Sequence, residues 1–391
     1  MPDAPAPTVG SGTSAPLAAV AELLADEPAL ADVIGRRDVR LAVPDAARGL
    51  VIGGLAHATD RRPIVVATAT QAEAERLAAD LEAIVGEDDV ALFPGWETLP
   101  FERVSPAVET MGQRMRTLHR LGDPVSAPRV VVAPAMSLVQ RLEPSAVVDP
   151  IVVGHGDEVD QGTLVERLVA FGYLREGQVE HRGEFAVRGS IIDVFPSTSE
   201  VPVRIDLWGD EVDRLTEFSV GDQRSSVTVA EVEVHPCREL RPDQAMRERA
   251  AALVATEPWG REQWDRIADG ALFDGMESWL PWLIDDEVVL PDLLPADALV
   301  LLVEPRRIRD RAAEILAEEA DLASSLARTW DVHADDLHRL HVDFDRILAR
   351  CDAPAWTMLA TADGPDTPAV AASGWDPVVG DVAPVITQIR N

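Results

Sequence analysis

The sequence predicts an α/β protein with a parallel-sheet domain in two segments, interrupted by a smaller α+β domain with an antiparallel sheet. Three observations support this fold class. Apolar strands alternate with amphipathic helices in the first part of the chain, short strands of period two fill the middle, and the strand–helix alternation returns near residue 298. Alternating strands and helices are typical of a parallel sheet whose two faces are both covered.

The first segment, residues 17–146, contains four expected strands. The run QAEAERLAADLEAIV at 71–85 is the clearest helix, because its apolar residues recur at three-to-four spacing. Further helices are expected in LVIGGLAHA and AVETMGQRMRTLHRL, and a short one in AMSLVQRLEP. Residues 1–16, rich in proline, alanine, serine and glycine, are expected to be disordered. The four strands are expected at 39–43, 63–70, 89–95 and 129–134.

The inserted segment, residues 147–237, has a different pattern. A helix is expected in TLVERLVAFGYL, and GEFAVRGSIIDVFP, VPVRIDLWG and EVDRLTEFSV are expected to form an antiparallel meander. Strand side chains alternate between faces. Arg204, Asp206 and Trp208 therefore share one exposed face, and Arg188 precedes the neighbouring strand SIIDVF. The opposite, core-facing residues are Val203, Ile205 and Leu207.

The second segment of the parallel-sheet domain is expected at residues 238–380. Helices are expected in DQAMRERAAALVAT and GREQWDRIADG, followed by a strand at 298–304 and a long helix from about 306 to 327. A further helix is expected at 334–350 and a last strand in AWTMLATA. Residues 381–391 are expected to begin a linker or a next domain, as in a chain cut from something longer.

Composition restricts the function. A net charge of −33 opposes strong binding of the whole surface to DNA phosphates or to an anionic membrane. No apolar run is long enough to span a bilayer, and the N-terminus lacks the basic start and apolar core of a secretion signal. Two cysteines, Cys237 and Cys351, are too few for a disulfide framework, so a cytoplasmic protein is expected.

The turn after the first strand has the architecture of a nucleotide site without its chemistry. All 35 basic residues are arginine, so the lysine that reaches nucleotide phosphates in a P-loop is missing. In P-loop register, Pro44 replaces the first glycine and Gly49 keeps the second, while Leu50 and Val51 stand at the lysine and magnesium-hydroxyl positions. Glu304 ends a later strand without an Asp-Glu pair for magnesium. The favoured interpretation is a fold of the nucleotide-binding type that does not hydrolyse ATP. The other interpretation is a strand–helix turn unrelated to nucleotide binding.

Histidines and carboxylates gather in HADDLHRLHVDFD, where His338 and His341 stand three residues apart near His333, Asp335 and Asp336. Such side chains at helical spacing can bind zinc or iron. However, no H-E-x-x-H motif is present. A solvated amphipathic helix is favoured over a metal site. Its expected core stripe is Leu337, Leu340 and Phe344.

Tryptophan usage is unusual, with nine tryptophans against one tyrosine, Tyr173. Trp96, Trp208, Trp279 and Trp282 lie in apolar or loop contexts. Platforms that stack nucleic-acid bases need surrounding positive charge, which this chain lacks. Most of the tryptophans are therefore expected in the core or at domain contacts.

Several motifs occur here in one order: LFPGWETLPFERVSP, VVVAPAMSLVQRL, the block GQVEHRGEFAVRGSIIDVFPSTSEVPVRIDLWGDEVDRLTEFSVGDQRS, and MESWLPWL. Together they resemble the N-terminal region of bacterial transcription-repair coupling factors, the Mfd family, in the part similar to the excision-repair protein UvrB. The resemblance covers residues 20–391, and the long central block is its most specific part. It implies a degenerate helicase-like domain of the P-loop NTPase type, made of 17–146 and 238–380, around the insert 147–237.

The resemblance implies that the insert binds UvrA. The family positions that contact UvrA fall here on Arg188, Arg204 and Trp208, although the family motif has phenylalanine where Trp208 stands. A planar guanidinium can bond a carboxylate or carbonyls in two places at once. Arginine and tryptophan are also among the residue types most enriched in binding hot spots.

The predicted function is a non-catalytic adaptor in transcription-coupled nucleotide-excision repair, which recruits UvrA to stalled RNA polymerase. No cofactor is expected in this chain, and the resemblance assigns ATP, magnesium, RNA polymerase and double-stranded DNA to motor and polymerase-binding domains absent from it. The family also implies a C-terminal domain that masks the UvrA surface, and a cytoplasmic, nucleoid-associated location. The alternatives are a nucleotide-hydrolysing helicase fragment with an unconventional site and a metal hydrolase centred on His338 and His341.

Overall fold

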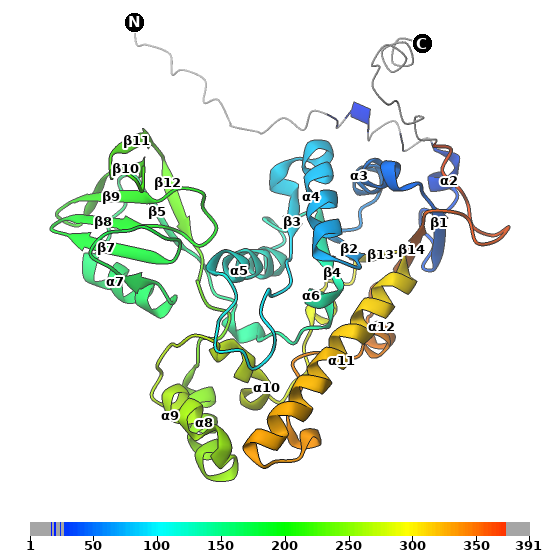
Figure 1. Cartoon of the computed structure of the whole chain (residues 1–391). Helices are drawn as coiled ribbons and strands as arrows, with labels where there is room; N and C mark the ends of the chain where they lie inside the picture. Colours follow the sequence, from blue (N-terminus) through cyan, green and yellow to red (C-terminus); the bar gives the residue numbers. More distant parts are fainter. Residues whose placement is uncertain (1–16, 18, 21–23, 25–26, 373–391) are drawn as a thin grey trace, which may run out of the picture.

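The computed structural model describes residue 17, residues 19–20, residue 24 and residues 27–372 (Figure 1). The expectations for residues 1–16 and 381–391 lie outside the described residues. One layer is a six-stranded, wholly parallel sheet in the order β1-β14-β13-β2-β4-β3. Its strands are β1 (Val39–Ala42), β2 (Ile64–Thr68), β3 (Val90–Leu92), β4 (Val130–Pro134), β13 (Leu299–Val303) and β14 (Ala355–Leu359).

Helices cover both faces of the parallel sheet, which is why its strands are almost wholly apolar. Leu55 and Leu81 belong to the core on one face, and Leu118, Ile315 and Ile347 to the core on the other. The first face is covered by α3 (Arg48–Ala58) and α4 (Gln71–Val85), and a short helix α2 (Pro28–Ala31) packs at its side. The second face is covered by α5 (Val108–Gly122), α6 (Ala135–Val139), α11 (Pro305–Trp330) and α12 (Phe344–Arg350).

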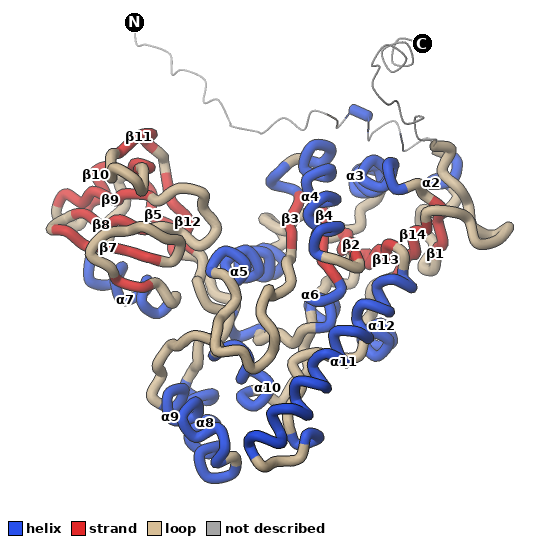
Figure 2. Tube along the Cα trace, viewed as in Figure 1, coloured by secondary structure: helices blue, strands red, loops and turns tan. Residues whose placement is uncertain are grey.

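The part of the chain between β4 and β13 contains a second six-stranded sheet, in the order β11-β10-β9-β8-β7-β6 (Figure 2). Its strands are antiparallel except for the β6–β7 pair. Helix α7 (Gln161–Ala170) packs on one face through Leu164 and Leu168. The strands are β6 (Leu174–Arg175), β7 (Glu184–Arg188), β8 (Ile191–Val194), β9 (Val203–Trp208), β10 (Glu211–Phe218) and β11 (Ser225–Thr228), and β5 (Ile151–Gly154) pairs separately with β12 (Glu231–Val234). The parallel sheet and the separate antiparallel sheet confirm the predicted α/β class.

A third group of helices was not predicted as a unit. Helices α8 (Gln244–Thr256), α9 (Arg261–Ala268) and α10 (Leu280–Leu283) pack with the end of α11 around a cluster of aromatic rings. Trp259 and Trp330 stack with 4.6 Å between ring centroids. Of the four tryptophans named above, three are buried as expected, Trp96, Trp279 and Trp282, whereas Trp208 is 81% exposed.

The helix expected at 334–350 is wrong over its first part. Only Phe344–Arg350 is α-helical, after a 3-10 turn at Ala334–Asp336. The Glu319 carboxylate accepts hydrogen bonds from the backbone N–H groups of Leu340 (2.7 Å) and His341 (3.3 Å), so these donors cannot serve a helix. The expected apolar stripe is buried without being helical throughout: Leu337, Leu340 and Phe344.

Helix α5 lies between the parallel sheet and the inserted sheet (Figure 2). Gly112 allows a close approach, since a Cβ there would lie 2.5 Å from the Cβ of Ser197. Arg182 of the insert forms an ion pair with Glu109 of α5 at 2.8 Å. Glu239, just beyond the insert, accepts a hydrogen bond from Arg114 of α5 at 2.6 Å. The insert is thus held against α5 by close packing and by charged contacts.

Candidate partner-binding face

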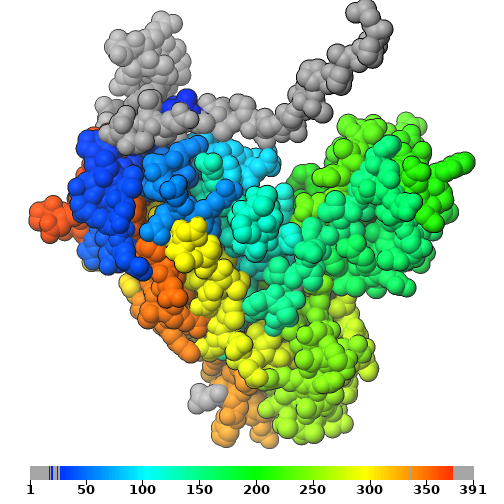
Figure 3. All heavy atoms as spheres, turned by 180° about the vertical axis from the view of Figure 1, so that it is seen from behind, coloured from blue at the N-terminus to red at the C-terminus, as the bar shows by residue number. Residues whose placement is uncertain are grey.

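The predicted core-facing side of strand β9 is confirmed, whereas of the three residues expected on its exposed side only Trp208 is largely exposed. Val203, Ile205 and Leu207 are buried, whereas Trp208 is 81% exposed. The green lobe that contains the antiparallel sheet protrudes from the rest of the molecule in the space-filling view (Figure 3). We call the side of the sheet opposite its core-facing residues the outer face. Arg188, Arg204, Asp206, Trp208 and Arg214 lie on this side, and Asp193 lies buried beneath them.

Strand register brings the predicted residues together at one end of the outer face. Asp193 of β8 is directly opposite Arg204 of β9. Arg188 of β7 is opposite Ile191, which in turn is opposite Asp206. Two tight turns contribute to this arrangement, because Gly189 and Gly209 adopt φ values of 63° and 65° directly after Arg188 and Trp208. Residues distant in sequence therefore form one surface.

Arg204 differs from the expectation that it is exposed. Its side chain is only 16% exposed, and its Nε and Nη2 donate to the two oxygens of Asp193 at 2.7 and 2.9 Å. The guanidinium also lies 4.8 Å from the centroid of the Phe218 ring. These bonds to Asp193 raise the pKa of Arg204. Most of its hydrogen-bonding capacity is therefore used within the sheet, and it braces the outer face.

Arg188 and Trp208 are the accessible members of the predicted set. The Arg188 side chain is 46% exposed, and its Nη2 lies 3.7 Å from Asp193 Oδ2, too far for a hydrogen bond. Its donors are thus open to a partner carboxylate or carbonyl. Asp193 is the residue that sequence reasoning missed, although alternation along SIIDVF places it on this face. The Asp193 side chain is 1% exposed, and its carboxylate lies near the guanidinium groups of both Arg188 and Arg204.

The four residues of the suggested nucleotide loop lie where β1 leads into α3. Pro44 follows the strand and precedes a 3-10 turn at Asp45–Ala47, and the other three residues occupy the start of α3. Those three are Gly49, Leu50 and Val51. Val51 is buried in the core, and a Cβ at Gly49 would lie 3.1 Å from the Cβ of Asp80. The loop is thus tightly packed against α4.

An ion pair occupies the carboxyl edge of the parallel sheet beside this loop. Arg48 Nη2 lies 2.7 Å from Asp45 and 2.6 Å from Glu304 Oε1. The same glutamate oxygen accepts the backbone N–H of Ala360 at 2.6 Å. Glu304 adopts a left-handed backbone with φ of 53°, which is unfavourable for a residue with a side chain. The pair joins the ends of β1, β13 and β14.

The suggested histidine site is not assembled as a helix. His341 is buried, with Nδ1 at 3.0 Å from Glu319 Oε2. The His338 ring packs near Trp282, with 5.3 Å between centroids, and its pKa is lowered chiefly by burial. Within the described residues, no three histidine, cysteine or acidic side chains come together in a way that could hold a metal ion.

Comparisons with known proteins give the class and then the family. Residues 151–240 match the family model described as UvrB interaction domain. The chain is 37% identical over 389 residues to the transcription-repair-coupling factor of Mycobacterium tuberculosis (strain CDC 1551 / Oshkosh), covering 89% of this chain and 31% of the relative. It is 31% identical over 331 residues to that of Bacillus subtilis (strain 168), covering 79% of this chain and 28% of the relative.

The fold and these matches define a protein that carries a UvrB interaction domain beside a parallel α/β sheet. The chain belongs to the transcription-repair coupling factor family and corresponds to its N-terminal region. It spans less than a third of the length of the relatives named above. Among the described residues, no helix has the length and apolar character needed to cross a bilayer.

Proposed function

We propose that this chain is a non-catalytic adaptor that recruits UvrA during transcription-coupled DNA repair. The outer face of the inserted sheet is the contact surface. One observation carries the proposal: a UvrB interaction domain exposes Arg188 and Trp208 together, beside an arginine already fixed on a buried aspartate. Exposed arginine and tryptophan at the centre of a surface are typical of binding hot spots.

The proposal gives the two arginines different roles. Arg188 donates to UvrA, because its guanidinium has no hydrogen bond within the described residues that satisfies its donors. Arg204 positions Asp193 and, through it, Arg188. Trp208 supplies apolar area that is removed from water on binding. Its larger ring replaces the phenylalanine of the family motif, so contact through an aromatic ring is kept.

The alternative, a nucleotide-hydrolysing helicase fragment, has less support. The carboxyl edge of a parallel sheet is where ligands bind in α/β proteins. Here Arg48 is 12% exposed and is held between two carboxylates, which leaves a surplus of negative charge where phosphates would lie. We therefore propose that the nucleotide site of this helicase-like fold is degenerate. Calorimetry with ATP and magnesium is expected to show no binding, and stoichiometric binding would contradict the adaptor proposal.

Binding of UvrA to the wild-type chain and to Arg188→Ala and Trp208→Ala tests the proposal. Loss of a hot spot costs at least about 2 kcal/mol, roughly thirtyfold in Kd. The matched control is Arg36→Ala, which removes an exposed arginine paired with Asp32 on another part of the molecule. The expected result is weaker binding for the two face variants and unchanged binding for the control. Equal binding by all four proteins would show that UvrA does not contact Arg188 or Trp208 and would contradict the proposal.

In a longer protein of this family, we propose that RNA polymerase and double-stranded DNA bind outside this chain. A C-terminal domain would cover the outer face until the polymerase is engaged. This chain alone would then bind UvrA more tightly than the longer protein does. Surface plasmon resonance on both proteins measures the difference, and equal affinity would rule out masking.

A further inference from the structure

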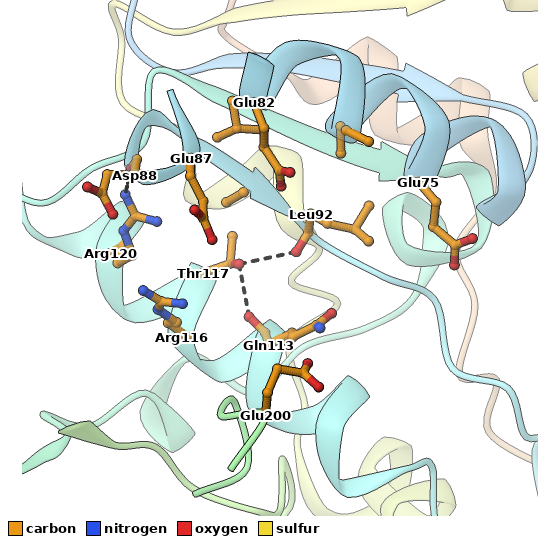
Figure 4. Close-up of a pocket in the computed structure, with 14 residues that line it drawn as sticks. Glu75, Glu82, Glu87, Asp88, Leu92, Gln113, Arg116, Thr117, Arg120 and Glu200 are labelled. Carbon is orange, nitrogen blue, oxygen red and sulfur yellow. Dashed lines mark hydrogen bonds between the residues drawn. The ribbon is translucent and has the colours of Figure 1, made fainter. Parts of the chain in front are cut away.

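The free edge of β3 lies in a groove to which no function is yet assigned. Strand β3 is the last strand of the parallel sheet and pairs only with β4 in the described residues. A cavity of about 420 Å³ runs beside it, between α4 and α5 (Figure 4). This volume is within the range of roughly 300–1,000 Å³ that is usual for ligand pockets.

The backbone of β3 presents a donor and an acceptor to this groove. Phe93 N–H donates to Val132 O of β4. In a parallel ladder, successive residues point their polar groups to opposite sides. The N–H and C=O of Leu92 therefore point away from β4. Leu92 O accepts only a long hydrogen bond, 3.4 Å, from the Thr117 hydroxyl among the described residues, and that hydroxyl donates to Gln113 O at the shorter distance of 2.9 Å.

The two walls of the groove carry opposite charges. On one side are the carboxylates of Glu75, Glu82 and Glu87, and on the other the guanidinium groups of Arg116 and Arg120 (Figure 4). None of the three glutamates forms an ion pair within the part of the chain that is described. Burial, and then repulsion from Glu87, raise the pKa of Glu82. The acidic wall therefore lacks its own cations.

On the basic wall, Arg120 donates to Ser126 O at 3.0 Å and to Asp88 O. Arg116 is exposed and makes no ion pair with another described residue. Glu200 also borders the groove, but it is paired with Arg182 at 2.8 Å. Asp88 also lines the groove beside Arg120, so the positive charge available to a ligand on this wall is chiefly that of Arg116.

The walls lie on opposite faces of the sheet. Leu81 of α4 packs in the core cluster that contains Val90. Leu118 of α5 packs in the cluster that contains Ala91 and Phe93. A strand added beside β3 would place alternate side chains toward α4 and toward α5. Its side chains would thus meet acidic and basic groups in turn.

We propose that an extended peptide segment of a partner protein adds as a strand to the free edge of β3, with basic side chains toward α4 and acidic side chains toward α5. Strand addition takes affinity from the backbone and specificity from alternate side chains. The charge pattern defines the ligand as a strand of alternating Lys or Arg and Asp or Glu. The opposing hypothesis is that the charges only protect a short edge strand from pairing.

Three synthetic heptapeptides of equal length and net charge test the proposal by fluorescence anisotropy. The first is Thr-Lys-Asp-Lys-Asp-Lys-Thr. The second has the same composition in blocks, Thr-Lys-Lys-Lys-Asp-Asp-Thr, so each strand face is mixed. The third repeats the first with alternate amides N-methylated, which removes donors needed for strand pairing. The alternating peptide is expected to bind at least about tenfold more tightly than either control.

Variants assign the binding to the groove. Glu82→Lys is expected to weaken the alternating peptide at least about tenfold, because it places like charges together. Glu248→Lys on α8 makes the same change of charge on an exposed residue outside the groove and should leave Kd unchanged. Hydrogen exchange should also slow in residues 90–92 when the peptide binds. Equal binding of all three peptides, no binding, or equal effects of the two variants would overturn the proposal.

Discussion

The carboxyl edge of the parallel sheet and the outer face of the inserted sheet each contain an arginine bonded to a carboxylate, but their charge balance differs. At the carboxyl edge, one guanidinium, Arg48, faces two carboxylates, Asp45 and Glu304. On the outer face, one carboxylate, Asp193, faces two guanidinium groups. The first arrangement leaves an excess of negative charge at that edge of the sheet. The second leaves positive charge facing solvent in a protein whose net charge is −33.

The largest expected effect follows removal of the carboxylate beneath the outer face. Asp193→Ala leaves the part-buried Arg204 without its partner, and breaking such a pair costs about 3 kcal/mol. Urea unfolding followed by circular dichroism measures the loss. The control is Asp206→Ala, whose carboxylate pairs with the exposed Arg214 at 3.1 Å. Exposed pairs contribute at most about 1 kcal/mol. Similar losses in both variants would contradict the bracing role of Asp193.

The next effect separates binding from stability on the same face. Arg188→Ala is expected to weaken UvrA binding by about 2 kcal/mol, while its folding stability changes by no more than about 0.5 kcal/mol. The reason is that Arg188 is half exposed and lies 3.7 Å from Asp193. Arg204→Ala should lose both binding and stability. The Kd for UvrA and the urea midpoint of unfolding are measured for both variants. A lower urea midpoint for Arg188→Ala than for Arg204→Ala would contradict these roles.

The sequence predicts which face of a strand a side chain lies on better than it predicts which side chains pair across neighbouring strands. Alternation along VRIDLW correctly separates Ile205 from Trp208, because a strand has a fixed period of two. It does not predict that Asp193 and Arg204 are opposite each other, because register across strands depends on turns and packing. The helix expected at 334–350 is wrong around Leu340 for a similar reason. The backbone N–H of Leu340 donates to the carboxylate of Glu319, which lies on another helix. Local pattern cannot anticipate such tertiary contacts.

A smaller effect is expected at the carboxyl edge. Arg48→Ala removes the contact that joins Asp45 to Glu304 and leaves a part-buried carboxylate, at a cost of about 1–2 kcal/mol. Thermal unfolding measures this loss. The same variant should bind no ATP in calorimetry, since it increases the local negative charge. If Arg48→Ala gained ATP binding, the ion pair would be blocking a nucleotide site that is otherwise able to bind. The carboxyl edge would then be a binding site like the outer face, which would contradict the comparison.

The smallest effect concerns a buried carboxylate that pairs with a histidine in place of an arginine. Burial alone would raise the pKa of Glu319, but hydrogen bonds from His341 and from backbone N–H groups outweigh it and hold this pKa below its ordinary value of 4.5. A carboxyl group with a lowered pKa stabilises the fold fully above the unfolded value and loses that contribution as the pH falls through the folded value. The stability difference between wild type and Glu319→Gln should therefore shrink as the pH falls below 4.5. Urea unfolding across that range measures it, and a difference that grows in acid would show that Glu319 is already protonated in the folded protein.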